Sequence, residues 1–188
     1  MGYLVHYGVK GQKWGIRRYE NKDGTLTAEG KEHYRQSRDR AYALKTHDDV
    51  ERIFGSFSKK DKKLLDAGED DKEYMDYEST AYWVSKRFLA KEGDIPVGFL
   101  DIIKGQNGEA NIAIGTDANY RGKGYASALA KQGADWIDSH PDVFSKVNWG
   151  AFKENEASIR LARKNGFELD RDDGNFAVYS KKGVKQHA

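Results

Sequence analysis

The chain has 188 residues, of which 38% are hydrophobic and 12% aromatic, enough for one domain with a substantial core. Charged residues make up 33% and the mean hydropathy is -0.87, so a polar or extended segment is expected beside that core. The sequence contains no cysteine, which excludes disulfides, thiolate metal sites and cysteine catalysis.

Membrane and secretion signals are not expected. No stretch reaches the roughly 18–20 apolar residues that a membrane span requires. The first residues, MGYLVHYGVKGQKWG, lack the apolar core of a secretion signal. These features predict a cytoplasmic protein without membrane contact. The five histidines are scattered without ligand spacing, so no metal is expected either.

The charge is unevenly divided along the chain. Residues 1–45 hold ten Lys/Arg and five Asp/Glu, net +5, whereas the remainder holds 22 and 25, net -3. We therefore predict a basic leader over 1–45, a folded domain over 46–182 and a short tail over 183–188. Several large apolar side chains interrupt the leader: Tyr3, Tyr7, Trp14, Ile16 and Tyr19. They favour a segment that orders on a partner or on the body, the alternative being a floppy leader.

After the leader, the pattern predicts two short helices, over 46–57 and 58–68. Thr46 or Asp48 is the expected cap of the first and Ser58 of the second, with Gly68 as its stop. An acidic loop with six carboxylates follows over 69–78. Strands are then predicted over 81–91, 96–104 and 108–115, separated by turns.

The second half alternates helices and strands. A helix is predicted over 124–139, a strand over 143–152, and a helix over 155–167 with Gly166 as its C-cap. Strands over 167–169 and 175–181 close the domain. The resulting order, ααβββαβαββ, predicts an α/β fold in which helices cover a mixed sheet.

One loop, YRGKGYA at 120–126, has the composition of an anion site. Gly122 and Gly124 let the backbone turn sharply and approach a ligand, and the unpaired amides that begin the next helix suit a pyrophosphate. Arg121 and Lys123 add positive charge. The loop lacks the patterns of a dinucleotide site or a phosphate loop, and a plain glycine turn with a solvated Arg/Lys pair remains the alternative.

Two linked motifs resemble those of the GNAT superfamily of acetyl-CoA-dependent N-acetyltransferases. The family's cofactor loop, Q/R-x-x-G-x-G/A, is matched by Arg121, Gly124 and Ala126. About 30 residues on, NWGAFKENEASIRLARKNGFEL resembles the second motif in its N-x-x-S-x-R-x-x-x-K-x-G-F form, typical of the subgroup resembling ribosomal-protein N-terminal acetyltransferases. The likeness covers roughly residues 46–182. It implies a mostly antiparallel sheet flanked by helices, with acetyl-CoA as cofactor.

The resemblance also implies which residues bind the cofactor. The loop should hold the pyrophosphate, the strand with Ile112 and Ile114 should run beside the pantetheine arm, and Asn155 should support that arm or simply cap its helix. The loop residues concerned are Arg121, Gly122, Lys123, Gly124, Tyr125 and Ala126.

The implied reaction is direct attack of a primary amine on the thioester, with the catalytic residues Ser158, Glu109 and Asn155. Many relatives protonate the thiolate with a tyrosine, but the corresponding residue is Ala162, so Ser158 becomes the candidate general acid. Its alternative role is packing. Glu109 is the candidate base, with ordered water as the alternative. Further wall residues would be Asp101, Tyr82 and Trp149.

The acceptor is expected to be an amine of a protein or small molecule. The acidic loop over 69–78 favours a cationic acceptor, unless it is only a solvated loop. A different class remains open: a non-catalytic, virion-associated or partner-binding protein that keeps the fold. Nucleic-acid binding is disfavoured because the body is net negative.

The leader resembles a short module of tailed-phage and prophage structural proteins. This likeness implies a phage or prophage origin and docking of residues 1–45 on a phage particle or host protein, with a virion-associated location as an alternative. The residues that carry it are His6, Gly8, Lys10, Gly11, Lys13, Trp14, Gly15, Arg17, Arg18, Tyr19, Asp23, Gly24, Thr27, Gly30 and Lys31.

Overall fold

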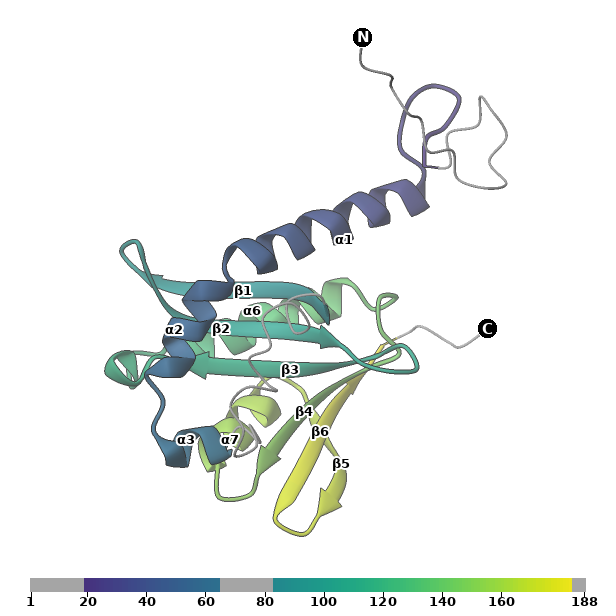
Figure 1. Cartoon of the computed structure of the whole chain (residues 1–188). Helices are drawn as coiled ribbons and strands as arrows, with labels where there is room; N and C mark the ends of the chain where they lie inside the picture. The colour runs from purple at the N-terminus through teal and green to yellow at the C-terminus, as the bar shows by residue number, and fades with distance from the viewer. Residues whose placement is uncertain (1–18, 65–82, 184–188) are drawn as a thin grey trace. The chain divides into compact units, whose positions relative to one another are not determined.

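The computed structural model describes residues 19–64 and 83–183 (Figure 1). The chain divides into two compact units, Met1–Arg38 and Asp39–Ala188. Several predicted features lie outside the described residues: the first part of the leader, Gly68, the acidic loop, Tyr82 and the tail beyond residue 183. Within the described ranges, no helix has both the length and the apolar character needed to cross a membrane.

The first unit contains a tight turn followed by the start of a helix, α1 (Ala28–Lys45). Glu20 forms a β-bridge with Leu26, and Gly24 between them has a φ of 82°. Thr27 caps α1, since its Oγ1 accepts the Gly30 N–H at 3.0 Å. The sequence did not predict this helix. Many of residues 28–45 are good helix formers, but they lack the apolar stripe by which a helix is recognised in a sequence.

The second unit is built on one six-stranded sheet in the order β1-β2-β3-β4-β6-β5. All neighbouring strands are antiparallel except β3 and β4, which are parallel, and this confirms the predicted mixed, mostly antiparallel sheet. The strands are β1 (Val84–Glu92), β2 (Ile95–Lys104), β3 (Glu109–Thr116), β4 (Lys146–Phe152), β5 (Glu168–Asp173) and β6 (Phe176–Lys182).

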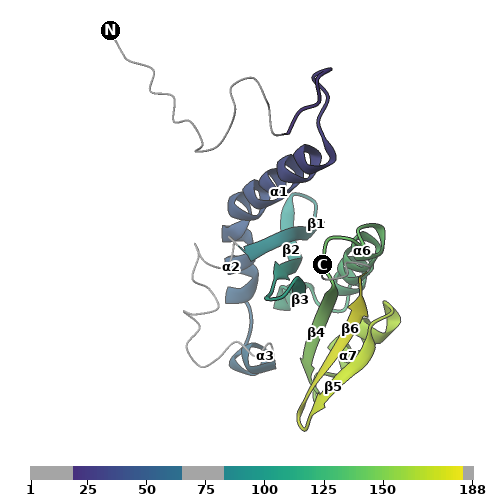
Figure 2. The same cartoon turned by 90° about the vertical axis from the view of Figure 1, so that its right-hand side faces the viewer.

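Helices cover both faces of the sheet (Figure 2). One face packs on α2 (His47–Gly55), whose Ile53 and Phe54 contact Phe99 of β2. The other packs on α6 (Tyr125–Ser139) and α7 (Glu156–Lys164), which share a core with Leu100 and Ile102. Because side chains alternate along β2, consecutive apolar residues point to opposite faces of the sheet and contribute to both cores. Within residues 46–64 and 83–183, the observed order of helices and strands agrees with the prediction.

The ends of the helices test the predicted caps. Ser58 caps α3 (Lys59–Leu64) as predicted: its Oγ accepts the Asp61 N–H at 3.1 Å, and its own N–H donates to Asp61 Oδ2 at 2.9 Å. Gly166 follows α7 with a φ of 79°. Thr46, one of the two residues predicted to cap α2, occupies the N-cap position, but its side chain makes no capping hydrogen bond. Because α1 runs to Lys45, the Thr46 hydroxyl instead donates to the Tyr42 carbonyl at 2.8 Å.

Candidate functional site

The site begins where two parallel strands separate. β3 and β4 pair only over Glu109–Asn111 and Lys146–Asn148, after which their ladder ends while both strands continue. Two cavities, of about 710 and 450 Å³, lie along the separated segments. Both are lined by Ile114 and by Leu64 at the end of α3, so the cavities meet at this part of the sheet.

The larger cavity opens onto the predicted glycine loop. Gly122 and Gly124 have φ angles of 79° and 87°, and a Cβ built on either meets nothing within 4 Å. The first intrahelical hydrogen bond of α6 runs from the Ala128 N–H to the Gly124 carbonyl, so the amides of residues 125–127 have no partner within the helix. Together with the positive end of the helix dipole, these amides form a cradle for an anion.

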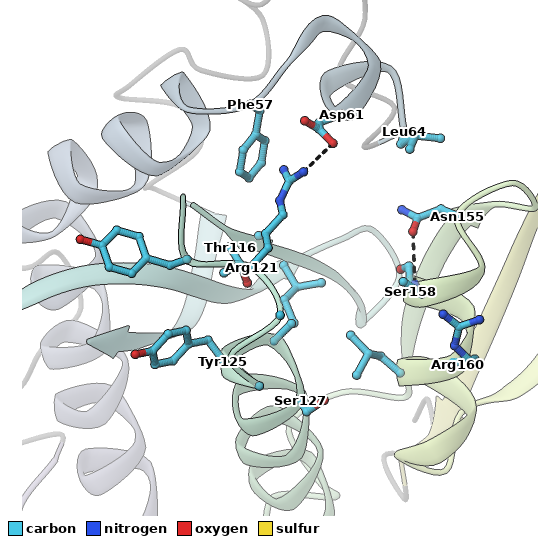
Figure 3. A pocket seen from close by; sticks show the side chains of 18 of the residues that line it. Phe57, Asp61, Leu64, Thr116, Arg121, Tyr125, Ser127, Asn155, Ser158 and Arg160 are labelled. Atoms are coloured by element: carbon cyan, nitrogen blue, oxygen red, sulfur yellow. Dashed lines mark hydrogen bonds and ion pairs between the residues drawn. The ribbon is translucent and has the colours of Figure 1, made fainter. Parts of the chain in front are cut away.

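The two cations of the loop, Arg121 and Lys123, differ in whether they line the larger cavity. Arg121 lines the cavity, lies over the Phe57 ring and donates from Nη1 to Asp61 Oδ1 at 2.9 Å (Figure 3). Burial acts to raise the pKa of Asp61, but the hydrogen bonds from Arg121 and Ser58 together outweigh it, so the pKa is lowered. Lys123 does not line the cavity. Its Nζ bonds Glu92 at 2.9 Å, and this contact lowers the pKa of Glu92.

Across the cavity, the start of α7 presents Asn155 and Ser158 (Figure 3). The Asn155 side chain caps α7 by accepting the Ser158 N–H at 3.2 Å. The Ser158 Oγ accepts the indole N–H of buried Trp149 at 2.9 Å. Because this bond uses an acceptor lone pair of the hydroxyl, its own hydrogen can be donated to another group.

β3 contributes residues to both cavities. Ile114 lines both, whereas Ile112 lines only the smaller one. Thr116 lines the larger cavity, and its Oγ1 is buried with no hydrogen-bond partner among the described residues. A buried polar atom of this kind is costly unless a bound molecule satisfies it. No local sequence pattern singles out Thr116, because its place at the cavity depends on where the strands separate.

Glu109 lies in the smaller cavity, apart from Ser158. It accepts a hydrogen bond from Asn148 Nδ2 at 2.9 Å, and Lys146 Nζ lies 3.4 Å from its Oε1. The pKa of Lys146 is raised, chiefly by its hydrogen bond to Asp170, with Glu109 acting in the same direction. The Asn148 Oδ1 is buried and has no hydrogen-bond partner among the described residues.

The other predicted wall residues have different places. Trp149 lines the smaller cavity. Asp101 lines neither and instead forms a buried two-bond ion pair with Arg87, at 2.7 and 2.6 Å. Burial raises the pKa of Asp101, while Arg87 opposes that shift. Ala162 is fully buried in the core and does not line the larger cavity.

Several lining residues of the larger cavity were not predicted. They come from the end of α2, from α3 and from α7, and include Phe57, Asp61, Leu64, Arg160, Leu161 and Lys164. Arg160 and Lys164 are separated by one helical turn, a spacing visible in the second motif. Among residues 19–64 and 83–183, no group of three or more His, Asp or Glu side chains could hold a metal ion.

Comparisons with known proteins identify the family of the chain. Residues 43–167 match the acetyltransferase (GNAT) family model. No curated protein sequence matches. The structure of smu.2055 from Streptococcus mutans UA159 has 18% identity and a TM-score of 0.53, and the match covers 74% of this chain and 94% of that one. The structure of PH1933 from Pyrococcus horikoshii OT3 has 22% identity and a TM-score of 0.51, and the match covers 63% of this chain and 80% of that one.

Other solved structures match over shorter stretches. The structure of yncA from Salmonella typhimurium, solved with its cofactor acetyl-CoA, has 15% identity and a TM-score of 0.46, with 54% of this chain and 66% of that one covered. The chain spans 65% of a GNAT acetyltransferase from Streptococcus pneumoniae. The family model, in contrast, covers well over half of this chain. The protein therefore belongs to the GNAT family of acetyltransferases, whose cofactor is acetyl-CoA.

Proposed function

We propose that the protein is an N-acetyltransferase that moves the acetyl group of acetyl-CoA directly onto a primary amine of a protein or small molecule. The observation that carries this proposal is the glycine cradle at the start of α6, which opens onto a cavity that also reaches Ser158. The cavity's volume, about 710 Å³, is within the usual range of ligand sites.

The residues around the larger cavity fit acetyl-CoA. The free amides of residues 125–127 and the Arg121 guanidinium suit a pyrophosphate, and the open space beside Gly124 leaves room for it. The unpartnered Thr116 Oγ1 can accept or donate a hydrogen bond to the same ligand. When bound, acetyl-CoA supplies an activated acyl thioester.

Two proton movements are assigned to residues of this chain. Ser158 donates a proton to the departing thiolate, since its Oγ accepts from Trp149 and its hydrogen is available. Glu109 removes the proton of the attacking amine from the side of the smaller cavity, directly or through water. Asn148, which bonds Glu109, also offers its buried Oδ1 to an amine N–H. Asn155 holds the α7 turn that carries Ser158.

Further proposals concern the acceptor, the subgroup, the origin and the location of the protein. A cationic amine is proposed as acceptor because of the six carboxylates in the sequence of residues 69–78. From the second motif we propose that the protein belongs to the subgroup resembling ribosomal-protein N-terminal acetyltransferases. From the leader we propose a phage or prophage origin and docking through residues 1–45. We propose a cytoplasmic location in a bacterial host, with association with virions as the alternative.

The test is an acetylation assay with the full chain, acetyl-CoA and three amine classes: a lysine peptide, a peptide with a free N-terminus, and spermidine. Release of the CoA thiol together with an acetylated product, identified by mass spectrometry, is the expected result. Acetyl-CoA binding without acetylation of any amine would instead favour the rival, a non-catalytic partner-binding protein. The buried Ala162 stands where many relatives have a catalytic tyrosine, and this replacement is the reason to consider a non-catalytic protein.

A further inference from the structure

A third cavity, of about 380 Å³, lies against a different face of α7 from the larger cavity. The α7 residues that line it follow the i, i+3, i+4, i+7 spacing of one helical face: Glu156, Ile159, Arg160 and Arg163. Strands β5 and β6 and the loop between β4 and α7 form its other walls. Of these α7 residues, Arg160 alone also lines the larger cavity, so the two cavities are separate sites.

The charges around the third cavity leave one cation without a carboxylate. Its described lining holds three cations and two carboxylates. Lys153 Nζ lies 2.7 Å from Asp172 Oδ1. Arg160 pairs with Glu156 one helical turn earlier at 3.1 Å. Arg163 is the remaining cation, and among the described residues no carboxylate pairs with it, so the lining has a surplus of one positive charge there.

Arg163 and Tyr179 place two hydrogen-bond donors side by side in this cavity. The Arg163 Nη2 donates to the Tyr179 hydroxyl oxygen at 3.1 Å, with the guanidinium over the tyrosine ring. The hydroxyl hydrogen has no acceptor among the described residues, although Tyr179 is only 3% exposed. Because buried polar groups are normally satisfied, this hydrogen points to an acceptor on a bound molecule. One anionic oxygen group can accept from this hydroxyl and from the remaining N–H groups of Arg163.

The third cavity also has an apolar wall. It is formed by Ile159 of α7, Leu169 of β5 and Ala177 of β6. Leu169 is 54% exposed, which is unusual for a large apolar side chain beside a cavity. An apolar wall with a few convergent polar groups is typical of small-molecule sites, and the volume of this cavity is within their usual range.

We infer that the third cavity binds a small organic monocarboxylate. The carboxylate accepts hydrogen bonds from Arg163 and Tyr179, and the apolar body of the ligand covers the wall around Leu169. A single negative charge balances the surplus at Arg163, whereas an inorganic phosphate has no part that could cover the apolar wall. This site does not depend on acetyl-CoA as the ligand of the larger cavity, so it stands or falls separately from the proposed function.

The inference is tested by NMR, titrating the isotopically labelled full chain with 4-phenylbutyrate at neutral pH and following the amide chemical shifts. Two matched probes divide the ligand into its parts: 4-phenylbutyramide keeps the apolar body without the charge, and acetate keeps the carboxylate without the body. 4-Phenylbutyrate should bind at least about tenfold more tightly than either. The largest shifts should fall on α7, β5 and β6 rather than on the glycine loop.

Two variants test the groups that hold the carboxylate. Arg163→Gln should weaken 4-phenylbutyrate binding at least about tenfold and leave 4-phenylbutyramide within about twofold. Tyr179→Phe keeps the buried ring and removes only the hydroxyl, so binding of the carboxylate should weaken about three- to tenfold. Lys131→Gln removes an exposed α6 cation that pairs with Asp135, and it should bind all three probes as the wild-type chain does.

Several results would overturn the site. One is equal binding of 4-phenylbutyrate and 4-phenylbutyramide by the wild-type chain, or no binding of 4-phenylbutyrate at about 10 mM. Another is unchanged binding in Arg163→Gln, or an equal loss of the acid and the amide, since Arg163 would then act only through the fold. Shifts centred on the glycine loop would place the ligand in the larger cavity instead.

Discussion

Ser158 illustrates what one residue of this site requires from its surroundings. Its N–H is fixed by the Asn155 cap and its Oγ by the Trp149 indole, so the hydroxyl is held at the cavity wall by two bonds. The motif in the sequence predicted Asn155 and Ser158 together, since they are three residues apart on one helix. It did not predict the bond from Trp149, which depends on how β4 packs against α7.

Replacing Ser158 with alanine should affect the chemical step and leave cofactor binding unchanged. We expect kcat to fall about 100-fold, the lower end for loss of a general acid, while the dissociation constant for CoA stays within about twofold. Initial rates on whichever amine the wild-type chain acetylates, with calorimetry for CoA, provide the measurement. Ser139→Ala is the matched control, because Ser139 lies at the end of α6 and does not line the larger cavity. Its Oγ lies 2.9 Å from the Trp136 carbonyl and 3.0 Å from His140 Nδ1. An unchanged kcat in Ser158→Ala would remove Ser158 from the mechanism.

Local sequence patterns predicted the order of helices and strands, but they could not predict which strands pair over long distances in the chain. Caps such as Ser58 and turns such as that at Gly166 depend on a few neighbouring residues. The short parallel contact between β3 and β4, which creates the cavities, joins residues far apart in the chain. Helix α1 was missed because nothing in its sequence alternates between apolar and polar faces.

A buried ion pair links three of these elements. Arg87 of β1 bonds Asp101 of β2 through two nitrogens and donates from Nη1 to the Ala43 carbonyl near the end of α1, at 2.8 Å. Arg87→Met leaves the Asp101 carboxylate buried without its partner, so the free energy of unfolding should fall by about 3–5 kcal/mol. Urea denaturation measures this change.

The double variant Arg87→Met/Asp101→Leu is the informative companion. Removing both charges avoids an unpaired buried carboxylate, so it should recover most of the lost stability. If the single variant has the same free energy of unfolding as the wild-type chain, the ion pair does not contribute to the stability of the fold. The two variants share the same site, and comparing them separates the cost of the orphaned charge from the loss of packing.

The whole molecule divides into two compact units, Met1–Arg38 and Asp39–Ala188. The first holds a turn whose details explain part of the leader's motif. A Cβ on Gly30 would lie 2.2 Å from the Tyr19 carbonyl oxygen, Asp23 accepts the Thr25 N–H at 2.9 Å, and Thr27 caps α1. The sequence identified Asp23, Thr27 and Gly30 by resemblance alone. The structure supplies a physical reason for each of them.

Removing residues 1–38 should leave the second unit folded and competent to bind acetyl-CoA, because the sheet, both cores and both cavities belong to residues 39–188. We expect the melting temperature to change by less than about 3 °C. Differential scanning calorimetry of the two forms tests this. A much larger fall would mean that the leader contributes to the stability of the domain.

Thermal unfolding with and without acetyl-CoA, in the wild-type chain and in Gly124→Glu, tests whether the glycine cradle binds the cofactor. At about 100 times its dissociation constant, acetyl-CoA should stabilise the wild-type chain by about 2.7 kcal/mol. Gly124→Glu should lose this effect, since its side chain enters the cradle as a competing anion. Gly174→Glu has a similar φ, 75°, in the β5–β6 turn, so it imposes comparable backbone strain and should keep the shift. No shift in the wild-type chain, or an undiminished shift in Gly124→Glu, would contradict the assignment of the cradle to acetyl-CoA.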